Sequence, residues 1–189
     1  MDDTIALAFL DQDGVITKEV HHLHRMEDLE ILPNVAKAIR AIRAKGFKIA
    51  VITNQAAVAK GIVELDQVLA LQKEIVRRLA DEGAVIDGYF YCPHHPQGTV
   101  EPYNRECDCR KPEPGMFKRA AVEFQEKFGK KVDFSASVTV GDKTGDILAG
   151  QAVGTRTVLV ETGYGGKDGV HEATPDFVAK DLFDAVQYF

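Results

Sequence analysis

The sequence predicts an α/β fold: a doubly wound, Rossmann-like parallel sheet with helices on both faces. Apolar runs of strand length alternate with segments in which apolar residues recur at helical spacing. Such alternation builds right-handed βαβ units, whose strands pair in parallel. The chain has 189 residues, 45% of them hydrophobic and 28% charged, which suits one domain with a buried core. Because no repeat or linker interrupts the pattern, we expect a single domain over residues 1–189.

Four elements are expected in the first part of the chain. Residues 5–10 form a nearly continuous apolar run, typical of a strand buried on both faces. Residues 35–44 carry apolar side chains at helical spacing, with Gly46 just beyond their end. A second apolar run at 47–52 predicts the next strand. An apolar stripe over 65–80 predicts a long helix.

The second part of the chain continues the alternation around one long loop. Strands are expected at 89–91, 138–140 and 157–160, and helices at 116–128, 147–152 and 182–186. The loop over residues 92–112 holds proline, glycine and all three cysteines. We therefore expect a small loop insertion here.

The charge balance excludes some classes of function. The chain has 23 Lys and Arg against 29 Asp and Glu, a formal net charge of −6, which disfavours the basic footprint of a nucleic-acid-binding protein. Its apolar stretches are far shorter than the ~20 residues that cross a membrane. The acidic start, Met1-Asp2-Asp3, differs from the basic start of a secretory signal. We expect a monomeric cytoplasmic protein that binds a small molecule and neither nucleic acid nor membrane.

Polar side chains follow the predicted strands at the points where the strands end. In open α/β sheets ligands bind beyond the carboxyl ends of the strands, so these side chains are expected on one rim. Taken singly, Asp or Asn after a strand is a common turn former or helix cap. Taken together, they predict a functional site. Its expected members are Asp11, Asp13, Thr53, Asn54, Lys111, Asp142 and Asp146.

This acidic rim suits a hard divalent cation. Asp11 and Asp13 are spaced Asp-x-Asp, and Asp142 arrives from another strand. Magnesium binds through one or two carboxylates, waters and often a substrate phosphate. Together with Lys111, such a cation would neutralise the charge of a phosphoryl group, which is the main catalytic demand of phosphoryl transfer.

The cysteines predict a second metal site. They are odd in number and clustered, which argues against a disulfide framework. Cys92-x-His94 and Cys107-x-Cys109 supply three thiolates and one imidazole, a set that suits tetrahedral zinc. His95 is a competing imidazole, and free buried cysteines are the alternative to a metal. With four protein ligands no position stays open for a reactive water, so the zinc would be structural, holding Arg110 and Lys111 beside the acidic rim.

Four ordered motifs carry a family resemblance. They are Phe9–Ile16 with Asp11-Gln12-Asp13-Gly14, then Thr53-Asn54-Gln55, Arg110-Lys111-Pro112, and Val140-Gly141-Asp142-Lys143-x-x-Asp146. The set resembles the haloacid-dehalogenase-like (HAD) phosphatases, and this resemblance implies a small zinc-binding loop insertion and no large cap domain. Within that superfamily, Cys-Pro-His-His-Pro followed by Cys-Asp-Cys-Arg-Lys-Pro resembles the histidinol-phosphatase and D,D-heptose 1,7-bisphosphate phosphatase group, with the heptose enzymes the nearer match.

The resemblance implies a role for each motif residue. Asp11 would be the nucleophile that forms an aspartyl-phosphate, and Asp13 the general acid and base. Magnesium would be bound by the Asp11 carboxylate, the Asp13 backbone carbonyl and Asp142. The family pattern also favours His94 over His95 as the zinc ligand. Thr53, the backbone near Asn54, Arg110 and Lys111 would hold substrate or phosphate, and Asp146 and Lys143 would support the site.

The substrate implied is a sugar phosphate, with D-glycero-D-manno-heptose 1,7-bisphosphate, cleaved at its 7-phosphate, as the leading expectation. Histidinol phosphate and other sugar-phosphate precursors are alternatives. A phosphoacceptor signalling module is a different class, but it expects adjacent acids after the first strand, whereas here they are spaced Asp-x-Asp. A zinc-loop module for nucleic acid is weaker still, since the chain is acidic.

The sequence departs from the heptose-enzyme pattern near the first motif. Position 12 is Gln where Arg is usual, and position 17 is Thr where Asn is usual. The loop that follows, residues 18–25, carries His21, His22 and His24, which either recognise a second phosphate or hydroxyl-rich leaving group or face solvent. Residues 163–166, Gly-Tyr-Gly-Gly, are expected to form a flexible turn. The departures leave the nucleophile and metal chemistry in place and bear on the substrate.

Overall fold

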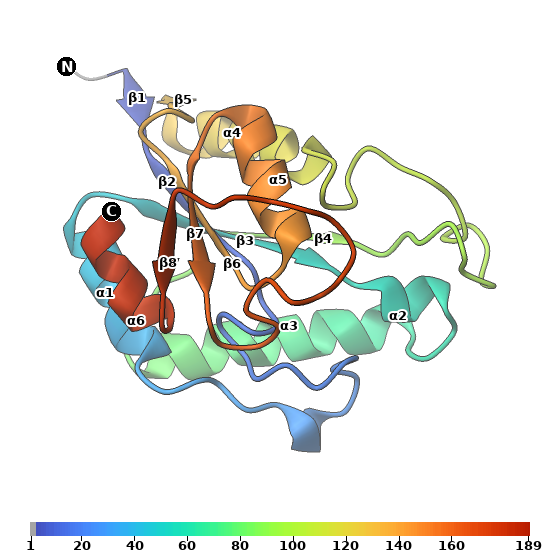
Figure 1. The fold of residues 1–189 in the computed structure, drawn as a ribbon. Helices are drawn as coiled ribbons and strands as arrows, with labels where there is room; N and C mark the ends of the chain where they lie inside the picture. The colour runs from blue at the N-terminus through green and yellow to red at the C-terminus, as the bar shows by residue number, and fades with distance from the viewer. Residues whose placement is uncertain (1–2) are drawn as a thin grey trace.

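The computed structural model describes residues 3–189 and confirms the predicted fold class (Figure 1). The six strands of the main sheet are all parallel. The sheet extends to both sides of Leu7–Leu10, its first strand along the chain, so the fold is doubly wound. In spatial order they are β4 (Gly88–Cys92), β3 (Lys48–Asn54), β2 (Leu7–Leu10), β6 (Val138–Gly141), β7 (Arg156–Val160) and β8 (Phe177–Ala179).

Helices cover both faces of this sheet (Figure 1). Apolar side chains of α1 (Val35–Ala44), α3 (Leu65–Asp81) and α6 (Leu182–Ala185) share one core cluster. Those of α4 (Gly115–Phe128) and α5 (Thr144–Val153) contribute to a second cluster on the opposite face. Every residue of β2 is fully buried between the two clusters, which explains why its sequence is continuously apolar rather than alternating.

Several element boundaries differ from the predicted ones. The apolar run 5–10 is not one strand: β1 (Thr4–Ile5) pairs with β5 (Lys131–Val132) in a separate two-stranded sheet, and only β2 enters the main sheet. Helix α5 begins three residues earlier than expected, because the Asp146 side chain accepts a hydrogen bond from the Lys143 backbone amide and caps its first turn.

Besides β5, four short elements were not predicted, because they are too brief to show a period. They are the 3₁₀ turns η1 (Met26–Asp28) and η2 (Val186–Tyr188), helix α2 (Ala56–Ala59) and edge strand β8. Within residues 3–189, no helix combines the length and the apolar character needed to cross a membrane.

The parallel strands place the ends of β2, β3 and β6 at one edge of the sheet. Leu10 pairs with Val51 on one side and Val140 on the other, and the Asp11 amide still donates to the Val140 carbonyl at 3.0 Å. The segment 11–34, blue in Figure 1, runs across this edge, and the 93–114 segment projects beyond β4. The predicted polar rim therefore lies beneath two long connections.

Candidate active site

Three buried carboxylates meet at the end of the sheet. Asp11 follows β2, Asp142 follows β6, and Asp146 lies in the first turn of α5. One carboxylate oxygen from each lies within 4.8 Å of the others. The pKa of Asp142 is raised to about 8, mainly by burial and secondly by the charges of Asp11 and Asp146. Within residues 3–189, Asp142 Oδ1 is buried with no hydrogen-bond partner. The donor set and its uncompensated charge fit a divalent cation such as Mg²⁺.

Asp142 is held in a close cradle of backbone. Its Oδ2 accepts a hydrogen bond from the Tyr164 amide at 2.8 Å, and its carbonyl accepts one from Gly166 at 2.7 Å. A Cβ atom on Gly14 or Gly163, both at positive φ, would overlap Oδ2. The Gly-Tyr-Gly-Gly turn, expected only as a flexible connection, thus positions a carboxylate of the site.

We expect Gly163→Ala to lower phosphatase turnover by about 100-fold, since the added methyl group must displace Asp142 and small displacements in a site are costly. Gly129→Ala is the matched control, because Gly129 has φ 67° against 66° for Gly163 and nothing within 4 Å of its Cβ position. Phosphate release and thermal unfolding should be measured for both. Equal loss of activity in the two variants would contradict the role of Gly163 in positioning Asp142.

Lys111 carries the positive charge of the site. Its Nζ donates to Asp11 Oδ1 at 2.9 Å and to the Ile52 carbonyl at 2.6 Å, and it lies 2.6 Å from Asp146 Oδ1. Burial opposes the charged form, but the Asp11 and Asp146 carboxylates outweigh it and raise the pKa of Lys111. Lys111 therefore stays a cation beside the carboxylates.

The Asn54 amide holds the backbone at Lys111 in place. Its Oδ1 accepts from the Lys111 amide and its Nδ2 donates to the Lys111 carbonyl, both at 3.1 Å. Neighbouring Thr53 is buried, and its hydroxyl accepts from Gln55 Nε2 at 3.0 Å. The Thr53 hydroxyl proton therefore remains available to a ligand.

Asp13 lies beside this cluster with one oxygen occupied. Its Oδ1 accepts from Gln12 Nε2 at 3.0 Å and from the Thr17 hydroxyl at 2.9 Å. The pKa of Asp13 is raised to about 6, mainly by burial and secondly by the charge of Asp11. A carboxyl group with such a pKa can both give and take a proton near neutral pH.

A pocket of about 280 Å³ opens next to Asp13. Three cations line it: Lys60, Arg110 and Lys143. Burial works against the charge on Lys143, yet neighbouring carboxylates, led by Asp11, raise its pKa. Lys143 also pairs with Glu19 at 2.8 Å and lies over the ring of Tyr164.

The three histidines of the 18–25 loop separate in the structure. His21 and His22 line the pocket, whereas the ring of His24 is hydrogen-bonded to the His22 carbonyl at 2.7 Å. Sequence reasoning missed Glu19, Lys60 and Tyr164. A lysine shortly after the Thr-Asn-Gln motif was a usable signal for Lys60; nothing local pointed to Tyr164.

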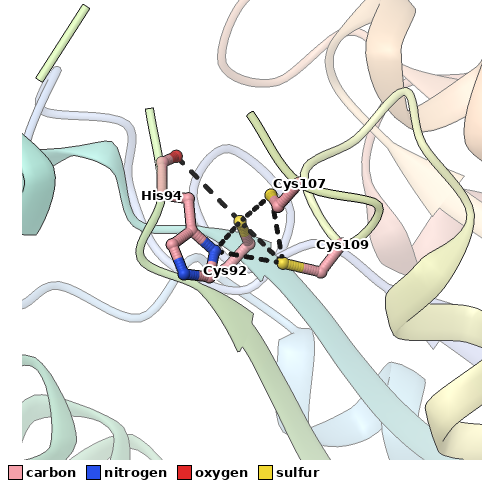
Figure 2. Close-up of side chains that lie close together, drawn as sticks. All are labelled: Cys92, His94, Cys107 and Cys109. Carbon is pink, nitrogen blue, oxygen red and sulfur yellow. Dashed lines mark hydrogen bonds between the residues drawn. The ribbon is translucent and has the colours of Figure 1, made fainter. Parts of the chain in front are cut away.

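The predicted sulfur and imidazole ligands also come together (Figure 2). The three sulfurs are 3.2, 3.2 and 3.5 Å apart, and His94 Nδ1 lies 3.3 Å from Cys109 and 3.7 Å from Cys92. A zinc tetrahedron with bonds of about 2.3 Å has sulfur–sulfur edges of about 3.8 Å, so a metal would spread the thiols only slightly. His95 lies outside the cluster, with Nδ1 accepting from the Gln97 amide at 3.1 Å.

The cluster joins the end of β4 to the loop that carries Arg110 and Lys111. Burial, together with the neighbouring Cys109 sulfur, raises the pKa of the Cys92 thiol. The Arg110 guanidinium donates to the His94 carbonyl at 3.4 Å. A metal bound here would therefore fix the backbone next to the acidic cluster.

Comparisons with known proteins agree with this arrangement. The family model for HAD-hydrolase-like proteins matches residues 108–185. The chain is 40% identical over 161 residues to the D-glycero-alpha-D-manno-heptose-1,7-bisphosphate 7-phosphatase of Photorhabdus laumondii, covering 85% of each chain. It is 36% identical to the D-glycero-beta-D-manno-heptose-1,7-bisphosphate 7-phosphatase of Yersinia pestis, covering 97% of this chain and 95% of that one.

A solved structure is similar over nearly the whole chain. It is the D,D-heptose 1,7-bisphosphate phosphatase of B. bronchiseptica complexed with magnesium and phosphate, with a TM-score of 0.81 and 29% identity, covering 97% of each chain. The heptose phosphatase of Burkholderia thailandensis gives a TM-score of 0.65 at 28% identity, again covering 97% of each chain.

Proposed function

Because this chain belongs to the haloacid-dehalogenase-like phosphatases, and within them to the heptose-1,7-bisphosphate 7-phosphatases, we propose that it hydrolyses the 7-phosphate of D-glycero-D-manno-heptose 1,7-bisphosphate through an aspartyl-phosphate. The observation that carries the proposal is the buried group of Asp11, Lys111 and Asp142, with Asp13 beside it, at the carboxyl end of a doubly wound sheet.

The residues divide the reaction into two steps. In the first, a carboxylate oxygen of Asp11 bonds to phosphorus, the bond from phosphorus to the sugar oxygen breaks, and Asp13 gives its proton to that oxygen. In the second, Asp13 takes a proton from water, the water oxygen bonds to phosphorus, and the bond from phosphorus to the Asp11 oxygen breaks, which releases inorganic phosphate and restores the Asp11 carboxylate. Asp11 and Asp142, with the Asp13 carbonyl, would hold Mg²⁺, which supplies positive charge beside the phosphoryl group.

The other motif residues bind and position. The Thr53 hydroxyl, the backbone near Asn54 and the Lys111 ammonium hold the phosphoryl oxygens, since all lie at the rim beside Asp11. Asp146 keeps Lys111 in place, because its Oδ1 is 2.6 Å from Nζ. Lys143 holds the 18–25 loop through its ion pair with Glu19.

The second phosphate of the substrate is assigned to the neighbouring pocket. Lys60 and Arg110 line it together with His22, while Asp13 opens onto the same space. Two cationic side chains and an imidazole suit a dianionic group at the far end of a bisphosphate.

We expect Lys60→Met to raise KM for the heptose bisphosphate about tenfold, because one charge-assisted contact of about 1.5 kcal/mol is lost. KM for the sugar 7-monophosphate should stay within about twofold on the same reasoning. Lys73→Met, an exposed lysine on α3, is the matched control. An equal rise for both substrates would argue against a second-phosphate contact at Lys60.

The zinc is proposed to be structural. Cys92, His94, Cys107 and Cys109 form a closed set of four ligands, which leaves no position for a reactive water. Its role is to fix the loop that delivers Arg110 and Lys111.

Phosphate release with magnesium tests the proposed function. The substrates are the two anomers of the heptose 1,7-bisphosphate, histidinol phosphate and 4-nitrophenyl phosphate. A strong preference for one heptose anomer, lost on chelating magnesium, supports the proposal. Preference for histidinol phosphate or turnover of the aryl ester alone would replace the substrate, and a phosphorylated Asp11 that does not turn over would favour a signalling module.

A further inference from the structure

A hydrogen-bonded chain runs from the edge strand β4 to Asp13. The Tyr89 hydroxyl lies 2.7 Å from Gln12 Oε1, and Gln12 Nε2 lies 3.0 Å from Asp13 Oδ1. Gln12 is only 3% exposed. Tyr89 is 77 positions away in sequence and reaches Gln12 from a strand separated from β2 by β3. No motif described above assigns a role to either side chain.

A phenol hydroxyl can donate or accept, so the Asp13 carboxylate, which accepts at Oδ1, fixes which way the Gln12 amide points. An amide oxygen only accepts and an amide nitrogen only donates. Because Nε2 faces Asp13 Oδ1, Oε1 faces the Tyr89 hydroxyl, which donates to it and holds the amide at its other end. With the amide reversed, two acceptor oxygens would meet at the 3.0 Å separation. The Gln12 backbone is also constrained, since its amide donates to Asp11 Oδ1 at 2.8 Å and its carbonyl accepts from Ile16 and Thr17.

Both contacts to the Asp13 side chain fall on the same oxygen. Gln12 Nε2 and the Thr17 hydroxyl donate to Oδ1, at 3.0 and 2.9 Å. Oδ2 has no such partner within residues 3–189, and Asp13 lines the pocket that would receive the leaving group. Because Oδ1 accepts from two donors, Oδ2 is the oxygen from which a protonated Asp13 donates.

We propose that Gln12, locked by Tyr89, is a positioning residue that aims Asp13 Oδ2 at the leaving-group oxygen. This inference rests on the proposed function. As the Asp11 oxygen bonds to phosphorus, the bond from phosphorus to the leaving oxygen breaks with its electron pair on that oxygen, which takes the Oδ2 proton. The network therefore matters most for esters of basic alcohols, such as sugars, whose oxygen leaves poorly without a proton.

Leaving-group dependence tests the proposal. The probes are phenyl phosphate and 4-nitrophenyl phosphate, which differ mainly in the basicity of the leaving oxygen, together with the heptose bisphosphate. The variants are Tyr89→Phe and Gln12→Met, with Asp13→Asn as a benchmark. Tyr91→Phe is the matched control, since Tyr91 lies two residues along the same strand and its hydroxyl has no hydrogen-bond partner in the described part of the chain.

We expect Tyr89→Phe to lower kcat/KM for phenyl phosphate and the heptose ester about tenfold, and Gln12→Met by about 30-fold, as fractions of the 10²–10⁴ that a general acid supplies. For 4-nitrophenyl phosphate the loss should stay within about threefold, because that oxygen leaves without a proton. The double variant should lose no more than Gln12→Met alone, since Tyr89 acts through Gln12.

Two outcomes overturn the inference while leaving the phosphatase intact. One is an equal loss on both aryl esters, which a general structural defect would give; the other is a loss in the double variant equal to the product of the single ones. A wild type that hydrolyses none of the three probes with magnesium would instead contradict the proposed function. Thermal unfolding of each variant identifies any that fail to fold.

Discussion

Asp11→Asn is expected to abolish phosphate release, lowering kcat by about 10⁴-fold or more, as removal of a nucleophile does in other enzymes with covalent intermediates. An amide cannot attack phosphorus as a carboxylate does, and the change also removes one of the three clustered carboxylates. Release of phosphate from the heptose bisphosphate and from 4-nitrophenyl phosphate, each with magnesium, measures the effect.

The same variant should fold at least as stably as the wild type without magnesium. The charge of Asp11 is a cause of the raised pKa of Asp142, so removing it relieves repulsion between buried carboxylates. Lys111 keeps its contact with Asp146 at 2.6 Å. Asp66→Asn, an exposed position at the start of α3, is the matched control for activity. Residual turnover of more than a few per cent in Asp11→Asn would exclude Asp11 as the nucleophile.

Cys107→Ser is expected to remove bound zinc and to lower the unfolding temperature by about 5–10 °C. A structural zinc can contribute about 10–16 kcal/mol to a small site. Here two hydrophobic clusters remain without it, so we expect a net loss of roughly 2–3 kcal/mol, which for a chain of this length corresponds to that shift. Metal content by mass spectrometry and calorimetry provide the measurements.

Adjacent histidines offer a control within the same loop. His94→Gln should lose zinc as Cys107→Ser does, because His94 Nδ1 faces Cys109 at 3.3 Å. His95→Gln should retain it, because His95 lies outside the cluster. The structural role would be refuted if the wild type, as isolated from cells supplied with zinc, holds no zinc and unfolds at the same temperature as Cys107→Ser. So would zinc loss on replacing His95 alone.

The fold and the location of the site could be predicted from sequence for one physical reason. Buried parallel strands are continuously apolar, and their carboxyl ends share one edge, so residues following them converge without any knowledge of packing. Asp11 and Asp142 were placed on that edge by this argument, and they lie together in the structure. The clustering of Cys92, His94, Cys107 and Cys109 was likewise predicted from two short Cys and His spacings, because closely spaced residues need little long-range information.

Element boundaries were predicted less well where local pattern and tertiary pairing disagree. The apolar run at 5–10 shows no sign of the division at Ala6, since β1 exists only because Lys131 and Val132 pair with it. Helix α5 starts early because the Asp146 side chain caps its first turn. From the sequence, Asp146 was assigned to the acidic site and not to a helix cap.

The sequence by itself determined the sheet, the acidic rim and the thiol cluster, because hydrophobic periodicity and ligand spacing are local properties of the chain. Only the tertiary structure decided that Gly163 and Tyr164 cradle Asp142, that Lys60 faces the same pocket as Arg110, and that Tyr89 reaches Gln12. These contacts join residues far apart in sequence, and each depends on a single side-chain orientation. Neither the composition nor the hydrophobic period of the sequence encodes such orientations. They are set by how β4 and the two long connections pack across the sheet.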